Sequence, residues 1–331
     1  MALKGFIKFE ILQINKELLL KMNLFPFKLD NVMNIFCYTE EQTVEYYNNA
    51  KLFFNEICPI CEVKMNYRSD CTKSFTTRTF QCPICNQILS KRSGTIFEGM
   101  KIHFKTFNLI VYYFADGFTI QQIYRLLKPL GASISLNTVR KYTKTIRLLI
   151  HLYIQESLSN LILPGPVEID EACCYKIRRG DHGRLAKTIY WVFGLKCRTT
   201  KQVIIYPVLY RNRKTIIPII RKHILPGTII YSDMFSCYFN NRVSPPESYL
   251  QQFGYIHYGI NHSIEFVSKI DASIHTNTIE RVWRGLKGKL REYKPRKYID
   301  EYISQYIMES LVPKYDRYFF IIALLHKFQN E

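Results

Sequence analysis

The spacing of apolar positions predicts helices in the first half of the chain and mainly strands in the second. Between residues 101 and 160, apolar side chains recur at the three- and four-residue steps of a helix. Beyond Pro164-Gly165-Pro166, which breaks the chain, short apolar and β-branched runs predict strands. These runs lie at 167–175, 189–197, 201–210, 228–232 and 256–260. Helical patterns occupy 214–224, a segment from about 276, and 298–328.

The order of the elements after residue 166 indicates a mixed sheet. Three strands, a helix and a further strand follow one another, which is the order expected of a sheet like that of ribonuclease H. Residues 234–255 contain Pro245-Pro246 and are predicted to form an irregular insertion. Residues 1–50 show one or two short helical patterns and indicate no function.

Four of the ten cysteines form two Cys-x-x-Cys pairs, Cys58 with Cys61 and Cys82 with Cys85. Each pair can direct two thiolates at one ion, and Zn²⁺ prefers a closed tetrahedron of four ligands. We therefore predict one structural zinc ion in a zinc ribbon. Two redox pairs or ordinary buried cysteines are the alternatives. The other cysteines are scattered, which fits a reducing compartment better than a disulfide framework.

Residues 119–128 and 137–147 carry two helical patterns joined by a turn that contains Gly131. This order is that of a helix-turn-helix, with Ser135 or Asn137 as the expected cap of the second helix. One face of the second helix would present polar and basic side chains to a DNA major groove. They are Asn137, Arg140, Lys141 and Lys144. Helix pairs are also common in segments that bind nothing, so DNA binding is one of two interpretations here.

The charge balance favours a nucleic-acid partner. The chain of 331 residues has 46 Lys and Arg against 27 Asp and Glu, a net charge of +19, interleaved with Tyr and Phe. Anionic lipid, or a merely basic soluble protein, is the alternative. No apolar run is long enough to span a membrane, so no membrane partner is expected. Charged residues interrupt the first 27 residues, which excludes a secretory signal there.

Three carboxylates have the context that metal-dependent DNA chemistry requires. Asp170 and Asp233 each close a short apolar, β-branched run that indicates a buried strand, and Glu280 lies in a helical pattern. A pair of Mg²⁺ or Mn²⁺ ions needs oxygen ligands that converge from separate elements. Lys287 follows Glu280 by two helical turns on the same face and could hold a DNA phosphate. Any one of these groups taken alone also fits a solvated charge.

Several sequence blocks resemble DDE transposases of the Merlin superfamily and their bacterial insertion-sequence relatives. The resemblance covers roughly residues 57–292, and the block His-Thr-Asn-Thr-Ile-Glu that ends at Glu280 is its most specific part. The other blocks occur in the same order, at Glu168–Glu171, Tyr190–Gly194, Ser232-Asp233 and Asn261–Ser263. The resemblance implies a ribonuclease H-like fold, divalent-metal catalysis and cut-and-paste DNA transposition. A match to eukaryotic elements would place the protein in the nucleus, and a bacterial origin would place it in the cytoplasm with the nucleoid.

Further residues are candidates for support of the metals or of DNA. Glu168 shares a strand face with Asp170, and Asn277 lies one turn before Glu280. The set that we assign to positions around the metals is Glu168, Asn277, His262 and His275. A single histidine is more often structural. A basic loop suited to the DNA backbone, or a simple exposed hairpin, contains Arg178, Arg179 and Arg184.

Together these features predict an α+β and α/β multidomain protein. The expected segments are an N-terminal helical arm, a zinc ribbon, a helical DNA-binding module, a ribonuclease H-like catalytic domain and a helical tail. Their predicted bounds are 1–50, 51–100, 101–163, 164–297 and 298–331. The expected function is a transposase that binds terminal inverted repeats and target DNA as a homodimer or larger assembly. A non-catalytic DNA-binding regulator and a nuclease without strand transfer are the rival functions.

Overall fold

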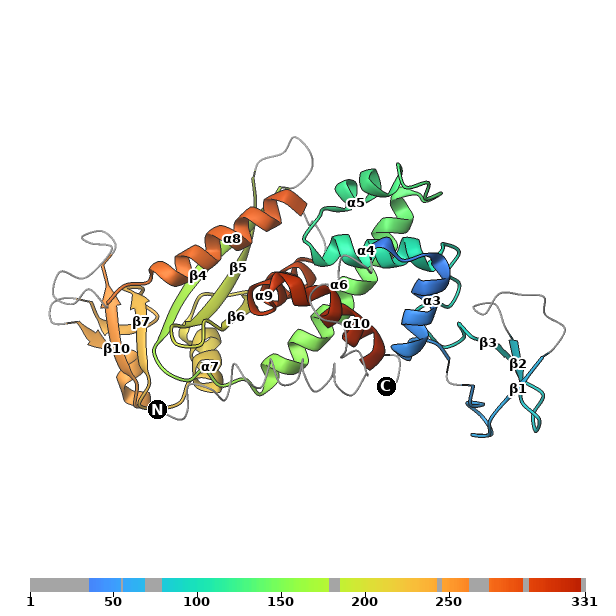
Figure 1. Cartoon of the computed structure of the whole chain (residues 1–331). Coiled ribbons are helices and arrows are strands. Elements are labelled where there is room, and N and C mark those ends of the chain that lie inside the picture. Colours follow the sequence, from blue (N-terminus) through green and yellow to red (C-terminus); the bar gives the residue numbers. More distant parts are fainter. Residues whose placement is uncertain are drawn as a thin grey trace. The chain divides into compact units, whose positions relative to one another are not determined.

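The computed structural model describes most of the chain from residue 36 onward, and its elements are labelled in Figure 1. The described ranges are 36–54, 56–68, 79–178, 185–242, 246–261, 274–293 and 298–328. They pack as two compact units. One unit contains residues 151–311, and the other contains the described residues up to 150 together with 312–328. Helix α6, Leu136–Ser159, contributes to both.

A mixed sheet forms the centre of the unit of residues 151–311. Its strand order is β10-β7-β4-β5-β6. Strand β4 pairs in parallel with β7 and antiparallel with β5, and β7 pairs in parallel with β10. The strands span Val167–Arg178 (β4), Leu185–Cys197 (β5), Val203–Val208 (β6), Ile229–Asp233 (β7) and Ile256–Ile260 (β10). The predicted strands are confirmed, and the mixed sheet fits a ribonuclease H-like domain.

The segment between β7 and β10 is more regular than its sequence indicates. It contains the short hairpin of β8, Phe239–Asn241, and β9, Glu247–Ser248, followed by a 3₁₀ helix, η2, at Tyr249–Phe253. These elements are too short to give a periodic pattern, and the prediction of an irregular insertion was therefore wrong for part of it.

Helix α8, Asn277–Tyr293, packs on β4 and β5 and runs along the sheet in Figure 1. Its close approach depends on Gly194 of β5, where an alanine Cβ would lie 2.6 Å from Cζ2 of Trp283. Helix α9, Ile299–Leu311, supports α8, because the hydroxyl of Tyr306 donates to the carbonyl of Val282 at 3.0 Å. Helix α7, Arg213–His223, buries Ile216, Ile217, Ile220 and His223.

The other unit is built from helices and a small three-stranded sheet. The helices are α3 (Glu40–Asn49), α4 (Phe104–Ala115), α5 (Ile120–Leu127), the first part of α6, and α10 (Arg317–Lys327). Stacked and edge-on rings fill the core, with Tyr47, Phe97 and Phe104 among the members. Asn108 of α4 accepts hydrogen bonds from the hydroxyls of Tyr47 and Tyr318, which fixes α10 to the rest of the unit. The fivefold division of the chain given above stays a prediction.

Candidate active site and metal centre

The parallel register of β4 and β7 brings Asp170 and Asp233 to corresponding positions. Glu168 pairs with Tyr231, and the two aspartates each lie two residues further along their strands. Side chains two residues apart in a strand share a face. Asp170 and Asp233 therefore point to the same side of the sheet, and both are partly buried.

Burial and the charge of Asp233 raise the pKa of Asp170 from its ordinary value of 3.8 to about 7. The indole N–H of Trp283 donates to Asp170 Oδ2 at 2.8 Å and opposes part of this rise. Asp233 Oδ1 accepts the backbone N–H of Phe235 at 3.0 Å. Asp170 is thus held at a place where its negative charge is costly, and a bound cation would relieve that cost.

Glu280 lies in the first turn of α8, where the hydroxyl of Thr276 donates to its Oε1 at 3.5 Å. Trp283 follows three residues later and Lys287 seven residues later, so the three side chains share a helix face. Lys287 is partly exposed, and its charge acts on Cys174 of β4, whose pKa burial raises to about 12. Lys287 therefore lies on the side of α8 that faces this strand.

The carboxylates of Asp170, Asp233 and Glu280 do not form one tight cluster. In the part of the chain that the structure describes, only the four cysteines form a group of three or more potential ligand atoms within 4.8 Å of one another. The sharing of a pair of metal ions by the three acids therefore stays a prediction. Asn277, the first residue of α8, is exposed to solvent.

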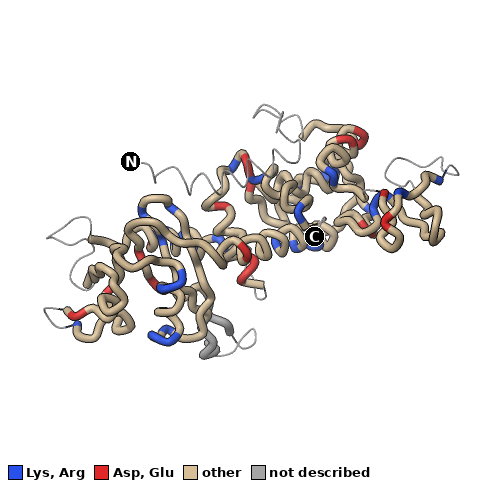
Figure 2. The backbone as a smooth tube through the Cα atoms, turned by 90° about the horizontal axis from the view of Figure 1, so that it is seen from below, with Lys and Arg blue, Asp and Glu red and all other residues tan. Residues whose placement is uncertain are grey.

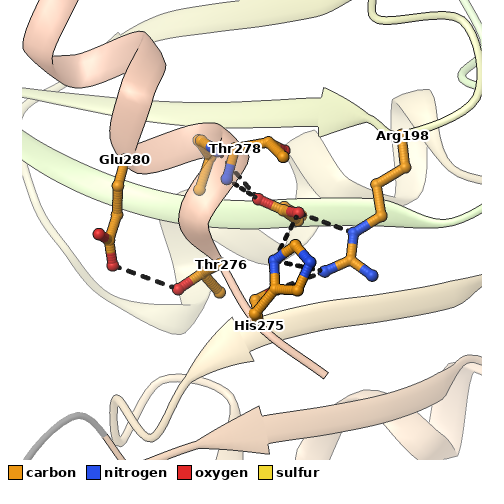
Figure 3. Close-up of polar contacts among 7 residues, drawn as sticks. Arg198, His275, Thr276, Thr278 and Glu280 are labelled. Carbon is orange, nitrogen blue, oxygen red and sulfur yellow. Dashed lines mark hydrogen bonds and ion pairs between the residues drawn. The ribbon is translucent and has the colours of Figure 1, made fainter. Parts of the chain in front are cut away.

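Glu168 is a deeply buried acid near the site, and its side chain has no exposed surface. It lies on the same face of β4 as Asp170, as predicted, but its carboxylate binds other groups of the protein. Arg198 Nε donates to one oxygen at 2.7 Å, and the backbone N–H groups of Thr278 and Ile279 donate to the other, each at 2.9 Å. Figure 3 shows this network beside Glu280.

Glu171 projects from the opposite face of β4 and is equally buried. Arg211 donates to its Oε2 at 2.9 Å, and the hydroxyl of Tyr238 donates to Oε1. The guanidinium of Arg211 also lies over the ring of Phe235, 4.4 Å from the ring centroid.

Arg198 and Arg211 were not predicted from the sequence, because each follows a strand and neither belongs to a periodic pattern. The hydrogen bond from Trp283 to Asp170 was not predicted either, because the helical pattern indicated only that Trp283 packs against the domain.

The four predicted zinc ligands come together. The sulfur atoms of Cys58, Cys61, Cys82 and Cys85 all lie within 4.8 Å of one another, and those of Cys58 and Cys85 are 3.6 Å apart. A tetrahedron with Zn–S bonds of about 2.3 Å has sulfur–sulfur edges of about 3.8 Å, so the cluster is compatible with a zinc ion.

The two cysteine turns have the same backbone design. Cys58 N–H donates to the carbonyl of Val63, and Cys82 N–H donates to that of Gln87, both at 2.9 Å. Within each turn the residue after the second cysteine has a positive φ, 55° at Glu62 and 59° at Asn86. The strands of the small sheet are β1 (Asn66–Tyr67), β2 (Thr79–Gln81) and β3 (Ile88–Ser90).

Helices α5 and α6 have the predicted helix-turn-helix order, and α6 lies within residues 101–160, for which helices were predicted. Ser135 caps α6, because its Oγ accepts the N–H of Thr138 at 3.1 Å. The polar face predicted for the second helix is solvent-exposed, and its members are Asn137, Arg140, Lys141 and Lys144. Arg140 donates to the side chain of Asn137 at 2.9 Å.

Lysines and arginines are distributed along both units, as Figure 2 shows. His262, Arg179 and Arg184 lie outside the described residues, and Arg178 is described only as the last residue of β4. Within the ranges described, none of the helices has the length and apolar character needed to cross a membrane.

Comparison with known families connects this geometry to a chemistry. Residues 162–310, which include Asp170, Asp233 and Glu280, match the family model of the ISXO2-like transposase domain. No curated protein matches the chain. The match confirms the resemblance to insertion-sequence DDE transposases, a family whose activity is metal-dependent and directed at DNA.

Proposed function

We propose cut-and-paste transposition as the activity of this chain, whose residues 162–310 match the transposase domain of insertion-sequence elements. In this proposal the protein binds the terminal inverted repeats of its element, cuts there, and joins the freed 3′-hydroxyl ends to target DNA. One observation carries the proposal. Asp170 and Asp233 occupy corresponding positions of adjacent parallel strands, and the indole of Trp283 ties the helix that contains Glu280 to the first of them.

Asp170, Asp233 and Glu280 are the residues that would hold two Mg²⁺ or Mn²⁺ ions. Hard divalent cations prefer carboxylate oxygens, and the raised pKa of Asp170 reflects a shortage of positive charge at this place. When bound, such ions lower the pKa of water and stabilise the charge that develops on the phosphate. Lys287 would contact a DNA phosphate from the same helix face, and the protein itself would form no covalent intermediate.

DNA binding is assigned to the zinc ribbon and to the exposed face of α6. Asn137, Arg140, Lys141 and Lys144 would lie in a major groove, with Arg140 as the candidate for a contact to a base edge. The tetrad of cysteines would hold one zinc ion that stabilises the ribbon and takes no part in catalysis. Because two element ends must be joined together, a homodimer or a larger assembly on DNA is expected.

The proposal is tested with the full chain and a duplex that carries the DNA ends flanking its gene. With Mg²⁺ the protein is expected to cut the duplex at the element ends and to join a pre-cut 3′ end to a plasmid. Asp233→Asn should abolish both steps and leave DNA binding intact. Glu247→Gln, which neutralises a solvent-exposed acid of the same unit, is the matched control and should behave like wild type.

Three results would favour other functions. Cutting without joining would indicate a ribonuclease H-like nuclease that lacks strand transfer. Binding without cutting, in Mg²⁺ and in Mn²⁺, would indicate a DNA-binding regulator. Equal activity of Asp233→Asn and wild type would remove the metal-dependent role from this domain.

A further inference from the structure

The buried carboxylate of Glu168 connects the elements on which the three candidate metal ligands lie. Its own strand, β4, carries Asp170 two residues later. Its partner Arg198 lies over the ring of Tyr231 in β7, 3.8 Å from the ring centroid, and Asp233 follows Tyr231 by two residues. Its other oxygen is bound to the start of α8, the helix that contains Glu280.

At the start of α8, Glu168 acts as a helix cap supplied from a distant part of the chain. The first N–H groups of a helix have no acceptor within the helix, and a side chain just before it usually accepts from the second or third of them. Here Thr278 and Ile279 are the second and third residues, and both N–H groups donate to Glu168 Oε2 at 2.9 Å. Thr276, which occupies the local cap position, directs its hydroxyl to Glu280 instead.

The second oxygen of Glu168 is occupied as well. Arg198 Nε donates to Oε1 at 2.7 Å, while Nη2 of the same guanidinium lies 3.2 Å from His275 Nδ1. Because a guanidinium only donates, His275 Nδ1 is the acceptor in this contact and does not donate to Glu168, 3.5 Å away. The carboxylate therefore has three donors for its roughly four acceptor sites, and a metal bound there would compete with a largely buried arginine and two helix N–H groups for the same two oxygens.

We infer that Glu168 is a positioning residue that fixes Glu280 relative to Asp170, and that it is not a metal ligand. Glu168 sets the start of α8 against β4, and Trp283 sets the next turn through its bond to Asp170. Glu280 lies between these two attachments, so its carboxylate can reach only a small region of space beside Asp170. The catalytic part of this inference rests on the proposed transposition activity, whereas the attachment of α8 does not.

The attachment is tested by amide hydrogen exchange on the full, magnesium-free protein. Glu168→Ala and Glu168→Gln are compared with Glu171→Gln, which alters an equally buried, arginine-paired acid on the other face of the same strand. We expect exchange in a peptide covering 276–283 to rise at least tenfold in Glu168→Ala, by less in Glu168→Gln, and not at all in Glu171→Gln. Unchanged exchange in both Glu168 variants would overturn the inference, whether or not the protein cuts DNA.

The role in catalysis is tested by cutting assays on Glu168→Gln, Arg198→Gln and the double variant. Glutamine at 168 keeps an acceptor for the helix N–H groups but leaves Arg198 without its anion, and the double change removes both buried charges. We expect Glu168→Gln to lower kcat at least tenfold with an unchanged KM for DNA, and the double variant to recover most of this loss. A double variant as inactive as Glu168→Gln would indicate that the carboxylate binds metal. An inactive wild type, with the exchange result as expected, would overturn the proposed function and leave the attachment of α8 established.

Discussion

Asp170→Asn should make the magnesium-free protein more stable while it abolishes activity. Burial and the neighbouring Asp233 raise the pKa of Asp170 from 3.8 to about 7. At about 1.4 kcal/mol per pH unit, keeping this group ionised at pH above 7 costs the fold about 4 kcal/mol. The amide of Asp170→Asn carries no charge, and its oxygen can still accept the hydrogen bond of the Trp283 indole, but the amide also loses hydration when it is buried. We therefore expect a gain of about 1–3 kcal/mol, which raises Tm by several degrees.

The pH dependence of this gain identifies its origin. Below pH 4, Asp170 is protonated in the folded and in the unfolded chain, so the carboxylate costs the fold nothing. Between pH 4 and 7 the unfolded chain releases the proton and the folded chain keeps it, so wild-type stability falls as the pH rises. The difference between Asp170→Asn and wild type should therefore grow from pH 5 to 7 and stay constant above 7.

The assay is thermal or urea unfolding from pH 5 to 8 in magnesium-free buffer that does not strip zinc. Glu247→Gln, which neutralises a solvent-exposed acid of the same unit, should change stability by less than about 0.5 kcal/mol at every pH. Added Mg²⁺ should stabilise wild type and have little effect on Asp170→Asn. An Asp170→Asn protein no more stable than wild type at pH 7.5, or a gain independent of pH, would refute the electrostatic reasoning.

Three other perturbations address different parts of the molecule. Removal of zinc, or Cys85→Ser, should unfold the ribbon and leave the sheet domain folded, and a zinc-free protein with freely reactive thiols would contradict this. Arg140→Ala should reduce the preference for the element's ends more than the total affinity for DNA, and an equal loss on random DNA would assign Arg140 to phosphate contact. Gly194→Ala should destabilise the protein by about 1–3 kcal/mol and lower cutting, because its Cβ would displace Trp283; wild-type Tm would show that the indole moves freely.

The sequence predicts the sheet well because the strands are continuous apolar runs. Asp233 ends β7 as predicted, but the prediction that Asp170 ends a strand was wrong, because Asp170 is the fourth residue of β4, which continues to Arg178. Helix α6 lies within residues 101–160, for which helices were predicted, although its second half exposes leucines such as Leu148 and Leu152. The hairpin of β8 and β9 could not be predicted, because strands of two or three residues are too short to show an alternation of apolar and polar side chains.

The roles of the acids in β4 could not be predicted, because periodicity assigns a face and does not name a partner. Glu168 and Asp170 share a face and both resemble ligands in the sequence. They differ because Arg198 and the start of α8, which lie 30 and 110 residues later in the chain, form hydrogen bonds with Glu168. Only the folded chain shows that these groups already occupy the carboxylate of Glu168.

Strand β4 therefore combines one candidate ligand with two acids that hold the surrounding elements in place. Glu168 fixes the start of α8, which precedes Glu280. Glu171 fixes the segment that follows Asp233, through the hydroxyl of Tyr238 and through Arg211. Glu168 and Glu171 are each paired with an arginine, whereas Asp170 accepts from the indole of Trp283, and burial together with the charge of Asp233 raises its pKa. The acids of β4 that are already paired with arginines are thus not the ones that we propose as metal ligands, and Asp170 is the member of the strand that we propose for that role.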